Sequence, residues 1–238
     1  MISVCIATYN GAPYITEQLT SICSQLSPTD EVIVSDDGST DGTLDVVRAF
    51  GDARIRIVQH VGPRNYTANF ENALLHAQGD YIFISDQDDI WLPTKVETVM
   101  RCLRDEGCYV VAHDATVTDA HLHATAPSYY NIKGHIFRSL AGNILRFSFL
   151  GCCLAVRREV LNRALPFPPD HKLCTHDNWL YLCGAAFGRA RVLNEPLILY
   201  RRHAGNTSQG GQNEHKPWTF RIHYRLYLIW HLLVRLLK

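Results

Sequence analysis

Short runs rich in β-branched and aromatic residues alternate with helical patterns through the first half of the chain, and this alternation constrains the fold more than any other feature. The runs have strand length and lie at 2–8, 31–35, 54–59, 81–85 and 109–113. Apolar residues recur at helical spacing in the segments between them, at 13–26, 42–50, 65–76 and 95–104. Continuous apolar strands separated by helices predict an α/β fold, in which a mostly parallel central sheet is flanked by helices.

The size and composition are those of a soluble globular protein. The 238 residues suffice for one substantial core, and 47% apolar with 19% charged residues excludes a disordered chain. The 23 basic and 23 acidic side chains cancel, so bulk charge gives no support to nucleic-acid binding. None of the eight cysteines forms a Cys-x-x-Cys pair and no secretory leader pattern is present, so we expect reduced thiols and a cytoplasmic location.

The regular alternation weakens after about residue 114, and 121–134 and 204–217 have the composition of loops. We see no internal repeat. The simplest organisation is one domain followed by a C-terminal helix, with a regular half at 1–115, a less regular half at 116–217 and the helix at 218–238.

Three of the predicted strands run into polar clusters. These lie at 8–11 (Thr-Tyr-Asn-Gly), 36–42 (Asp-Asp-Gly-Ser-Thr-Asp-Gly) and 86–89 (Asp-Gln-Asp-Asp). Ligands of parallel α/β sheets bind beyond the carboxyl ends of the strands, so we expect a site where these clusters meet. The chain has neither a Gly-x-Gly-x-x-Gly nor a P-loop pattern, so neither dinucleotide binding nor P-loop phosphate binding is supported.

Asp86 and Asp88 directly follow a buried strand. Carboxylates this close repel each other unless a cation lies between them, and a hard divalent ion that also bridges phosphate oxygens fits that place. The alternative is structural, because Asp88 or Asp89 could cap the helix that follows Pro93.

The 36–42 cluster also has two interpretations. Ser39, Thr40 or Asp41 could cap the next helix, which accounts for the end of the cluster but not for Asp36 and Asp37. A carboxylate at a strand end suits a hydrogen bond from a ribose hydroxyl or a pyrimidine N–H.

Two further polar residues carry weight only in combination with these clusters. Asp177 by itself is typical of a helix N-cap, and His203 by itself is typical of a surface histidine.

Four motifs in order resemble glycosyltransferase family 2. They lie at 7–10 (Ala-Thr-Tyr-Asn), 36–43, 79–81 (Gly-Asp-Tyr) and 86–93 (Asp-Gln-Asp-Asp-Ile-Trp-Leu-Pro). The resemblance covers roughly 2–115, and 148–208 through shorter motifs. It implies a GT-A fold, a nucleotide-sugar donor bound by the first half of the domain, a divalent metal, and inversion at the anomeric carbon.

The resemblance also implies roles for individual residues. Asp86 and Asp88 match the motif that holds the metal (Mn²⁺ or Mg²⁺) and the donor diphosphate, and His203 matches a histidine that completes the metal site in some members. Asp177 falls where the family places its general base, although His176 stands where an acidic residue is usual. The residues implied around the donor are Ala7, Thr8, Asn10, Asp36, Asp37, Asn69 and Asp86.

The C-terminal segment 218–238 has no acidic residue. Its four cationic side chains fall on one arc of a helix, opposite an apolar side. The longest uncharged stretch, 226–234, is too short to span a bilayer. Two interpretations stay open: an interfacial helix on anionic lipid, or a helix packed on the domain through the same apolar side. That apolar side comprises Leu226, Ile229, Trp230, Leu233 and Leu237.

Together these observations predict an inverting, metal-dependent glycosyltransferase. By the resemblance, the donor is a UDP- or dTDP-sugar and the acceptor a glycan or polyprenyl-diphosphate-linked hydroxyl, as in O-antigen or capsule assembly by rhamnosyl- and hexosyltransferases. Such an enzyme would be cytoplasmic or peripheral at the inner face of the cytoplasmic membrane. Two other classes are an α/β phosphatase with an Asp-x-Asp site and a non-catalytic nucleotide-sugar-binding module.

Overall fold

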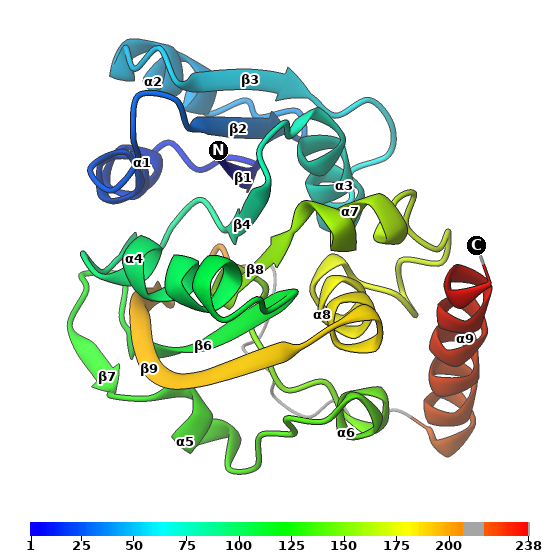
Figure 1. Ribbon diagram of the computed structural model, residues 1–238. Coiled ribbons are helices and arrows are strands. Elements are labelled where there is room, and N and C mark those ends of the chain that lie inside the picture. The colour runs from blue at the N-terminus through cyan, green and yellow to red at the C-terminus, as the bar shows by residue number, and fades with distance from the viewer. Residues whose placement is uncertain (207–216, 238) are drawn as a thin grey trace.

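A curled β-sheet runs through the middle of the molecule, with helices packed on both of its faces (Figure 1). The computed structural model describes residues 1–206 and 217–237. Within these residues the sheet has nine strands, in the order β3-β2-β1-β4-β8-β6-β9-β5, with β7 paired to β6. The predicted α/β class is confirmed. Most of the loop predicted at 204–217, and Lys238, lie outside the described residues.

The first half of the sheet is parallel, as predicted. Its strands are β1 (Ile2–Thr8), β2 (Glu31–Asp36), β3 (Ile55–Gln59) and β4 (Tyr81–Ser85). They are joined by α1 (Ile15–Cys23), α2 (Thr43–Phe50) and α3 (Tyr66–His76). Thr8 pairs with Asp36 across β1 and β2, and Ile6 with Ser85 across β1 and β4. The register therefore aligns the carboxyl ends of these strands at one edge, where the three polar clusters meet.

The second half of the sheet mixes parallel and antiparallel pairs. β8 (Leu154–Arg157) runs antiparallel to both β4 and β6 (Val110–Thr118), while the long β9 (Ala190–Arg201) runs parallel to β6. β5 (Ile90–Trp91) pairs antiparallel with β9. The end of β9, from the last third of the chain, is thereby placed beside the segment that follows β4.

The central strands are buried on both faces, because helices cover the sheet on both sides. Val4, Ile6, Val32 and Ile84 are fully buried, and each such side chain contributes about 1.5–3 kcal/mol through burial. This explains why the strands read as continuous apolar runs instead of alternating ones.

Three predicted segments differ in detail. The helix predicted at 95–104 divides into α4 (Lys95–Met100) and a π-helical turn, η1 (Arg101–Asp105). The strand predicted at 109–113 continues to Thr118, because β9 pairs with it over this length. The loop predicted at 121–134 contains β7 (Ala124–Ala126), which pairs with β6, and α5 (Tyr129–Lys133).

The remaining helices cover the second half. They are α6 (Leu140–Leu145), α7 (Arg158–Ala164) and α8 (His176–Phe187). A 3₁₀ turn, η2 (Gly151–Cys153), contacts α8 and leads into β8. α9 (Trp218–Leu236) lies along the outside, against α6 and α8 (Figure 1). Among the described residues, no helix is long and apolar enough to cross a membrane.

Candidate active site

Gln87 joins the segment after β4 to the segment after β1. Its Oε1 accepts hydrogen bonds from Thr8 Oγ1 (2.5 Å) and the Tyr9 backbone N–H (2.9 Å), and its Nε2 donates to the Tyr9 carbonyl (3.1 Å). A Cβ on Gly11 would lie 2.3 Å from Gln87 Oε1, so a larger residue there would displace the Gln87 amide. Gln87 is the variable position of the Asp-x-Asp pattern, which is why the sequence did not single it out.

A second set of hydrogen bonds joins the segments after β1 and β2. The Asn10 N–H donates to Ser39 Oγ (2.9 Å), and Asn10 Oδ1 accepts from the Thr40 N–H (2.9 Å). Asn10 has a φ of 50°, a left-handed conformation that asparagine tolerates better than most residues. Thr8 and Asn10, both predicted donor contacts, therefore lie in one fixed turn that Ala7 leads into.

The two carboxylates after β2 have different surroundings. Asp36 is 1% exposed and closes its own turn, accepting from the backbone of Gly38 (3.1 Å) and Ser39 (2.9 Å) and from Ser39 Oγ (2.5 Å). Asp37 is less buried. Its Oδ1 lies 2.7 Å from His60 Nδ1, and its Oδ2 accepts from the Asn65 N–H at 2.9 Å. The geometry gives Asp36 a supporting role and leaves Asp37 as the better candidate for contact with a ligand.

Asn69 lies in the interior behind this edge. Its Oδ1 accepts from Ser35 Oγ (2.6 Å), and its Nδ2 donates to the carbonyls of Thr8 (3.2 Å) and Ser35 (2.9 Å). Because the amide is used inside the protein, we assign Asn69 a positioning role between β1 and β2. We therefore do not propose the direct contact between Asn69 and the sugar donor that the resemblance implies.

Asp88 and His203 face each other at the rim. His203 Nε2 lies 2.8 Å from Asp88 Oδ2, and both side chains are 9% exposed. The Gly205 N–H donates to His203 Nδ1 (3.1 Å), which fixes the orientation of the ring with Nε2 toward Asp88. Asn206 Nδ2 also donates to Asp88 Oδ2 (3.1 Å), and the His203 ring stacks on Tyr14 with centroids 4.3 Å apart.

Asp86 lies on the inner side of the same segment. One oxygen each from Asp86 and Asp89 and the Cys152 sulfur lie within 4.8 Å of one another. Burial raises the pKa of the Asp86 carboxyl to about 7, and the charge of Asp88 adds to this, so Asp86 and Asp88 act on each other. Burial also raises the pKa of Asp89 well above its ordinary value, with Asp88 and Asp86 contributing.

Lys95 brings a cation beneath this acidic group. It is 1% exposed, its Nζ donates to the Cys152 carbonyl (2.9 Å), and Nζ stands 4.0 Å from the Trp91 ring centroid. Burial lowers the pKa of Lys95 to about 8, while the charges of Asp89 and Asp86 act in the opposite direction. Lys95 therefore balances part of the acidic charge and holds the η2 turn in place.

The possible metal-ligand atoms at the rim fit a hard divalent cation. A carboxylate oxygen and an imidazole nitrogen, as in Asp88 and His203, are ligands that Mn²⁺ accepts, and Asp86 supplies a further carboxylate nearby. The trio of Asp86, Asp89 and Cys152 fits less well. A hydrogen bond with Cys153 and burial raise the pKa of the Cys152 thiol well above its ordinary value, so the sulfur stays protonated. A neutral thiol is a poor ligand for Mg²⁺ or Mn²⁺.

Asp177 stands in the first turn of α8. Its Oδ1 accepts from Thr175 Oγ1 and from the Asn178 N–H (2.8 Å), while among the described residues Oδ2 has no hydrogen-bond partner. A Cβ on Gly151 would lie 2.6 Å from His176 Nε2 and 3.4 Å from Asp177 Cβ. The η2 turn thus touches Asp177 through Gly151 and Asp86 through Cys152, and it joins the two carboxylates in one wall.

His176 takes no part as a second acid or as a charged group. It is buried and stacks on Phe70 with centroids 4.0 Å apart, and its two ring nitrogens have no partner among the described residues. Burial lowers the pKa of His176, so the ring is neutral. Asp177 is consequently the anionic group at this helix terminus.

Aromatic and cationic side chains surround Asp177. Burial raises the pKa of Tyr66 and of Tyr129, and in both the charge of Asp177 adds to the rise. Burial lowers the pKa of Lys133, with Asp177 acting in the opposite direction. Tyr66 makes an edge contact with His176, the residue that precedes Asp177.

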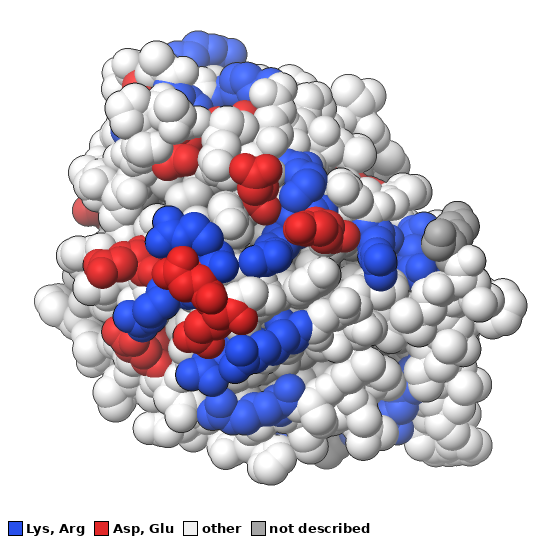
Figure 2. Space-filling model, viewed as in Figure 1, with Lys and Arg blue, Asp and Glu red and all other residues white. Residues whose placement is uncertain are grey.

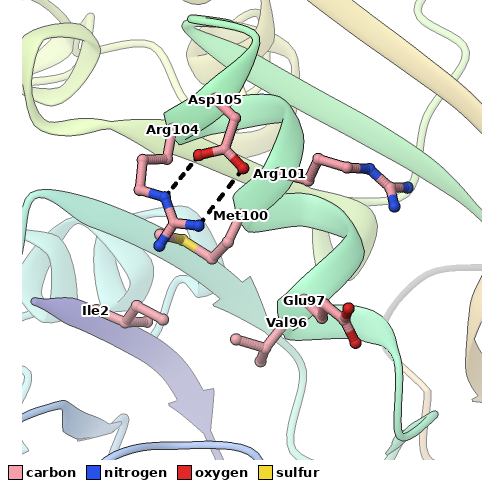
Figure 3. A pocket seen from close by; sticks show the side chains of 7 residues that line it. All are labelled: Ile2, Val96, Glu97, Met100, Arg101, Arg104 and Asp105. Carbon is pink, nitrogen blue, oxygen red and sulfur yellow. Dashed lines mark hydrogen bonds and ion pairs between the residues drawn. The ribbon is translucent and has the colours of Figure 1, made fainter.

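A pocket lies away from this site. It has a volume of about 400 Å³ and is bounded by Ile2, α4 and η1, with Arg104 paired to Asp105 at its rim (Figure 3). Ile2 begins β1, whereas the polar clusters follow Thr8 at its other end. The pocket therefore lies at the amino edge of the parallel strands and takes no part in the candidate site.

Comparisons with known proteins agree with the predicted resemblance. The family model described as Glycosyl transferase family 2 matches residues 3–165. An uncharacterized glycosyltransferase of Nostoc sp. is 27% identical over 212 residues, which are 86% of this chain and 66% of the relative. The dTDP-rhamnosyl transferase RfbG of Shigella flexneri is 29% identical, covering 84% and 72%. The Escherichia coli UDP-Glc:alpha-D-GlcNAc-diphosphoundecaprenol beta-1,3-glucosyltransferase WfaP is 27% identical, covering 87% and 80%.

Solved structures show the same fold. The S. aureus TarS 1–349 structure with UDP-GlcNAc superposes with a TM-score of 0.70 at 20% identity, over 100% of this chain and 66% of that one. The mannosyltransferase PcManGT of Pyrobaculum calidifontis, solved with GDP-Man and Mn²⁺, gives 0.64 at 23% identity, over 98% and 72%. The predicted GT-A fold is thereby confirmed. The chain spans about two thirds of the length of the Nostoc relative and of the TarS chain.

Proposed function

The chain belongs to glycosyl transferase family 2, and from this premise we propose that it moves a sugar from a nucleotide-diphosphate donor to an acceptor hydroxyl, with inversion at the anomeric carbon. One observation supports this most strongly. The acidic rim of Asp86, Asp88 and His203 and the carboxylate of Asp177 are joined into one site by the η2 turn. A glycosyl transfer needs both parts. A cation held at the acidic rim stabilises the negative charge of the leaving diphosphate, and a base takes the proton of the acceptor hydroxyl.

In this proposal a divalent ion, Mn²⁺ or Mg²⁺, is held by Asp88 and His203 with Asp86 beside them. Bound there, it would supply Lewis-acid stabilisation of the negative charge that gathers on the departing diphosphate. The donor set of this chain supports the assignment, and PcManGT, which shares the fold, was solved with Mn²⁺. Asn206 orients Asp88, and Tyr14 fixes the His203 ring by stacking.

Asp177 serves as the general base. Thr175 and the Asn178 N–H hold its Oδ1, which leaves Oδ2 to accept the proton of the acceptor hydroxyl. As that proton moves to Oδ2, the acceptor oxygen bonds to the anomeric carbon and the bond from that carbon to the diphosphate breaks. A single displacement of this kind inverts the configuration at the anomeric carbon.

The donor nucleoside lies against the edge formed by Ala7, Thr8, Asn10 and Asp37. Asp37 presents a carboxylate acceptor, which suits the N3–H of uracil or thymine, or a ribose hydroxyl. We propose a UDP- or dTDP-sugar, because the related RfbG is named a dTDP-rhamnosyl transferase and the related WfaP a UDP-glucose enzyme. The transferred sugar is then rhamnose or a hexose.

The proposed acceptor is a glycan, free or carried on a polyprenyl diphosphate. WfaP is named for a diphosphoundecaprenol-linked acceptor. Within the proposal, the protein acts in surface-polysaccharide assembly such as O-antigen or capsule synthesis. Within the proposal it works in the cytoplasm, at the inner face of the cytoplasmic membrane when the acceptor is lipid-linked.

The two alternative classes account for fewer of the residues. A phosphatase that used Asp86 or Asp88 as nucleophile would leave Asp37 and Asp177 without a role. A non-catalytic module would have no need of Asp177 beside the acidic rim.

Calorimetric titration of UDP, dTDP, GDP and ADP, with and without Mn²⁺, tests the donor part of the proposal. We expect Mn²⁺-dependent binding of UDP or dTDP by the wild-type chain. With the corresponding nucleotide sugar and a suitable acceptor, the chain should release the nucleoside diphosphate. Asp45 is exposed on α2, and Asp45→Asn should bind nucleotide as the wild type does. Absence of binding by all four nucleotides, or phosphate release from simple phosphoesters, would contradict the proposal.

A further inference from the structure

One side of α9 is a continuous exposed apolar surface, which we call the apolar face of α9. Its members range from 38% exposed at Ile229 to 89% at Leu237. At about 100° per residue they fall within an arc of roughly 120° along the whole helix. The members are Trp218, Ile222, Leu226, Ile229, Trp230, Leu233, Leu236 and Leu237.

The opposite side of α9 is already packed on the domain. Leu228 and Leu232 are buried there, and the Tyr227 hydroxyl accepts from the Asp170 N–H (2.9 Å). Arg225 donates to the Leu145 carbonyl (3.0 Å), and Arg235 donates to the Pro166 carbonyl. The helix therefore does not pack through Leu226, Ile229, Trp230, Leu233 and Leu237, and that sequence-based alternative was wrong. The arginine side of the helix, and not its apolar side, faces the body.

We propose that the apolar face of α9 docks on the surface of an anionic lipid bilayer. Two exposed tryptophans, Trp218 and Trp230, lie on it, and tryptophan favours the interface between headgroups and acyl chains. The helix bears exposed Arg221 and no acidic residue, and Figure 2 shows no acidic side chain over α9 on the face in view. Nothing on the helix repels anionic headgroups, which attract the cation.

A second copy of the chain is a poorer occupant by charge. Two such faces brought together would bring an exposed Arg221 from each helix and no acidic side chain from either, so no ion pair could form between the helices. A bilayer supplies the opposite charge and also receives the exposed apolar side chains.

α9 also contacts the candidate site. The Tyr224 hydroxyl lies 3.2 Å from Asn178 Nδ2, and Asn178 directly follows Asp177. Burial raises the pKa of Tyr224 to about 12, so the hydroxyl stays protonated. A chain docked through α9 would hold Asp177 close to the lipid surface, where a lipid-linked acceptor presents its glycan. This last step rests on the proposed function, whereas docking itself does not.

Vesicle flotation of the full chain tests the docking. We expect the wild type to float with vesicles of equimolar phosphatidylcholine and phosphatidylglycerol, and to do so less with phosphatidylcholine alone. Leu226→Gln/Leu233→Gln should weaken binding at least about tenfold, since each leucine loses apolar contact with lipid. Leu75→Gln is the matched control, because Leu75 on α3 is 62% exposed and Leu226 61%, and it should bind as the wild type does.

Intrinsic fluorescence gives a second readout that needs no variant. Trp218 and Trp230 are exposed, whereas Trp91 and Trp179 are buried, so a blue shift on adding anionic vesicles would report burial of the α9 tryptophans. Wild-type chain left in the lipid-free fraction, or a double variant that floats as the wild type does, would overturn the inference. A wild-type dimer that Leu226→Gln/Leu233→Gln converts to a monomer, with no vesicle binding, would overturn it in favour of a second copy.

The two proposals fail separately. Vesicle binding together with absent nucleotide binding would support docking and contradict the proposed function. Mn²⁺-dependent nucleotide binding together with absent vesicle binding would do the reverse. The double variant should keep the nucleotide affinity of the wild type, because neither leucine contacts the donor edge.

Discussion

His203 Nε2 lies 2.8 Å from Asp88 Oδ2, although the two residues are 115 positions apart in the chain. The contact forms because β9 runs parallel to β6 and ends at the rim, just before His203. It joins a motif of the first half of the chain to a residue of the second half.

Removing His203 should weaken metal-dependent donor binding. His203→Ala takes away an imidazole nitrogen that faces Asp88, so we expect the affinity for UDP or dTDP in Mn²⁺ to fall at least about tenfold, or about 1.4 kcal/mol. Calorimetric titration measures it. His121→Ala, at an exposed histidine, is the control and should leave the affinity unchanged. An unchanged affinity in His203→Ala would remove this residue from the metal site.

Replacing Asp177 should abolish transfer and spare donor binding. Asp177→Asn keeps the shape of the side chain but cannot take the acceptor proton, and we expect turnover to fall by about 10²–10⁴. Release of nucleoside diphosphate with acceptor gives the rate, and titration gives the donor affinity. Turnover near that of the wild type would exclude Asp177 as the base.

Lys95 should matter for stability. Lys95→Met removes a buried cation near Asp86 and Asp89 and leaves the Cys152 carbonyl without its donor, so the free energy of unfolding should fall by about 1–3 kcal/mol. Urea denaturation measures it. Lys172→Met, at an exposed lysine, should change stability by less than about 0.5 kcal/mol. Equal stability of the two variants would contradict the role given to Lys95.

The metal-free protein should lose stability as the pH rises from about 4 to about 7. Burial raises the pKa of Asp86 from 3.8 to about 7, so the folded state binds this proton more tightly than the unfolded state does. The resulting stabilisation is present below pH 4 and is lost as the pH passes through 7, by as much as about 4 kcal/mol. Denaturation in urea at several pH values measures the slope. Asp86→Asn should reduce it, while the raised pKa of Asp89 keeps part of the slope in the variant. A variant with the slope of the wild type would contradict the assignment.

Gln87 should matter for the donor edge. Gln87→Ala removes the hydrogen bonds that hold Thr8 and Tyr9, and we expect about tenfold weaker nucleotide binding with about 1–2 kcal/mol lower stability. Gln78→Ala, at an exposed glutamine, is the matched control for titration and denaturation. Equal effects of the two substitutions would show that Gln87 does not organise this edge.

The part of the fold that depends on local pattern could be predicted from the sequence. The parallel strands and their helices follow from continuous apolar runs and helical spacing, and the polar clusters follow from the strand ends. The second half could not be predicted this way, because β8 and β9 pair with β4 and β6 across long stretches of chain. Such pairing depends on tertiary contacts that periodicity does not encode.

The site was predictable where residue type carries the chemistry and less so where geometry decides. Asp88 and His203 lie together as the resemblance implied, but Asn69 points into the interior, which residue type does not reveal. Gln87 and Lys95 act through contacts with backbone atoms far away in the chain. Their residue types alone do not indicate such contacts. The exposed face of α9 depends on which side packs, and the helical wheel alone left that choice open.

The sharpest test of the metal site is anomalous diffraction at the manganese edge from crystals of the protein grown with Mn²⁺ and UDP or dTDP. We expect one manganese peak bonded to Asp88 and His203, within reach of Asp86 and of the nucleotide diphosphate. A peak enclosed by Asp86, Asp89 and Cys152, or a bound nucleotide whose diphosphate has no metal beside it, would contradict this expectation.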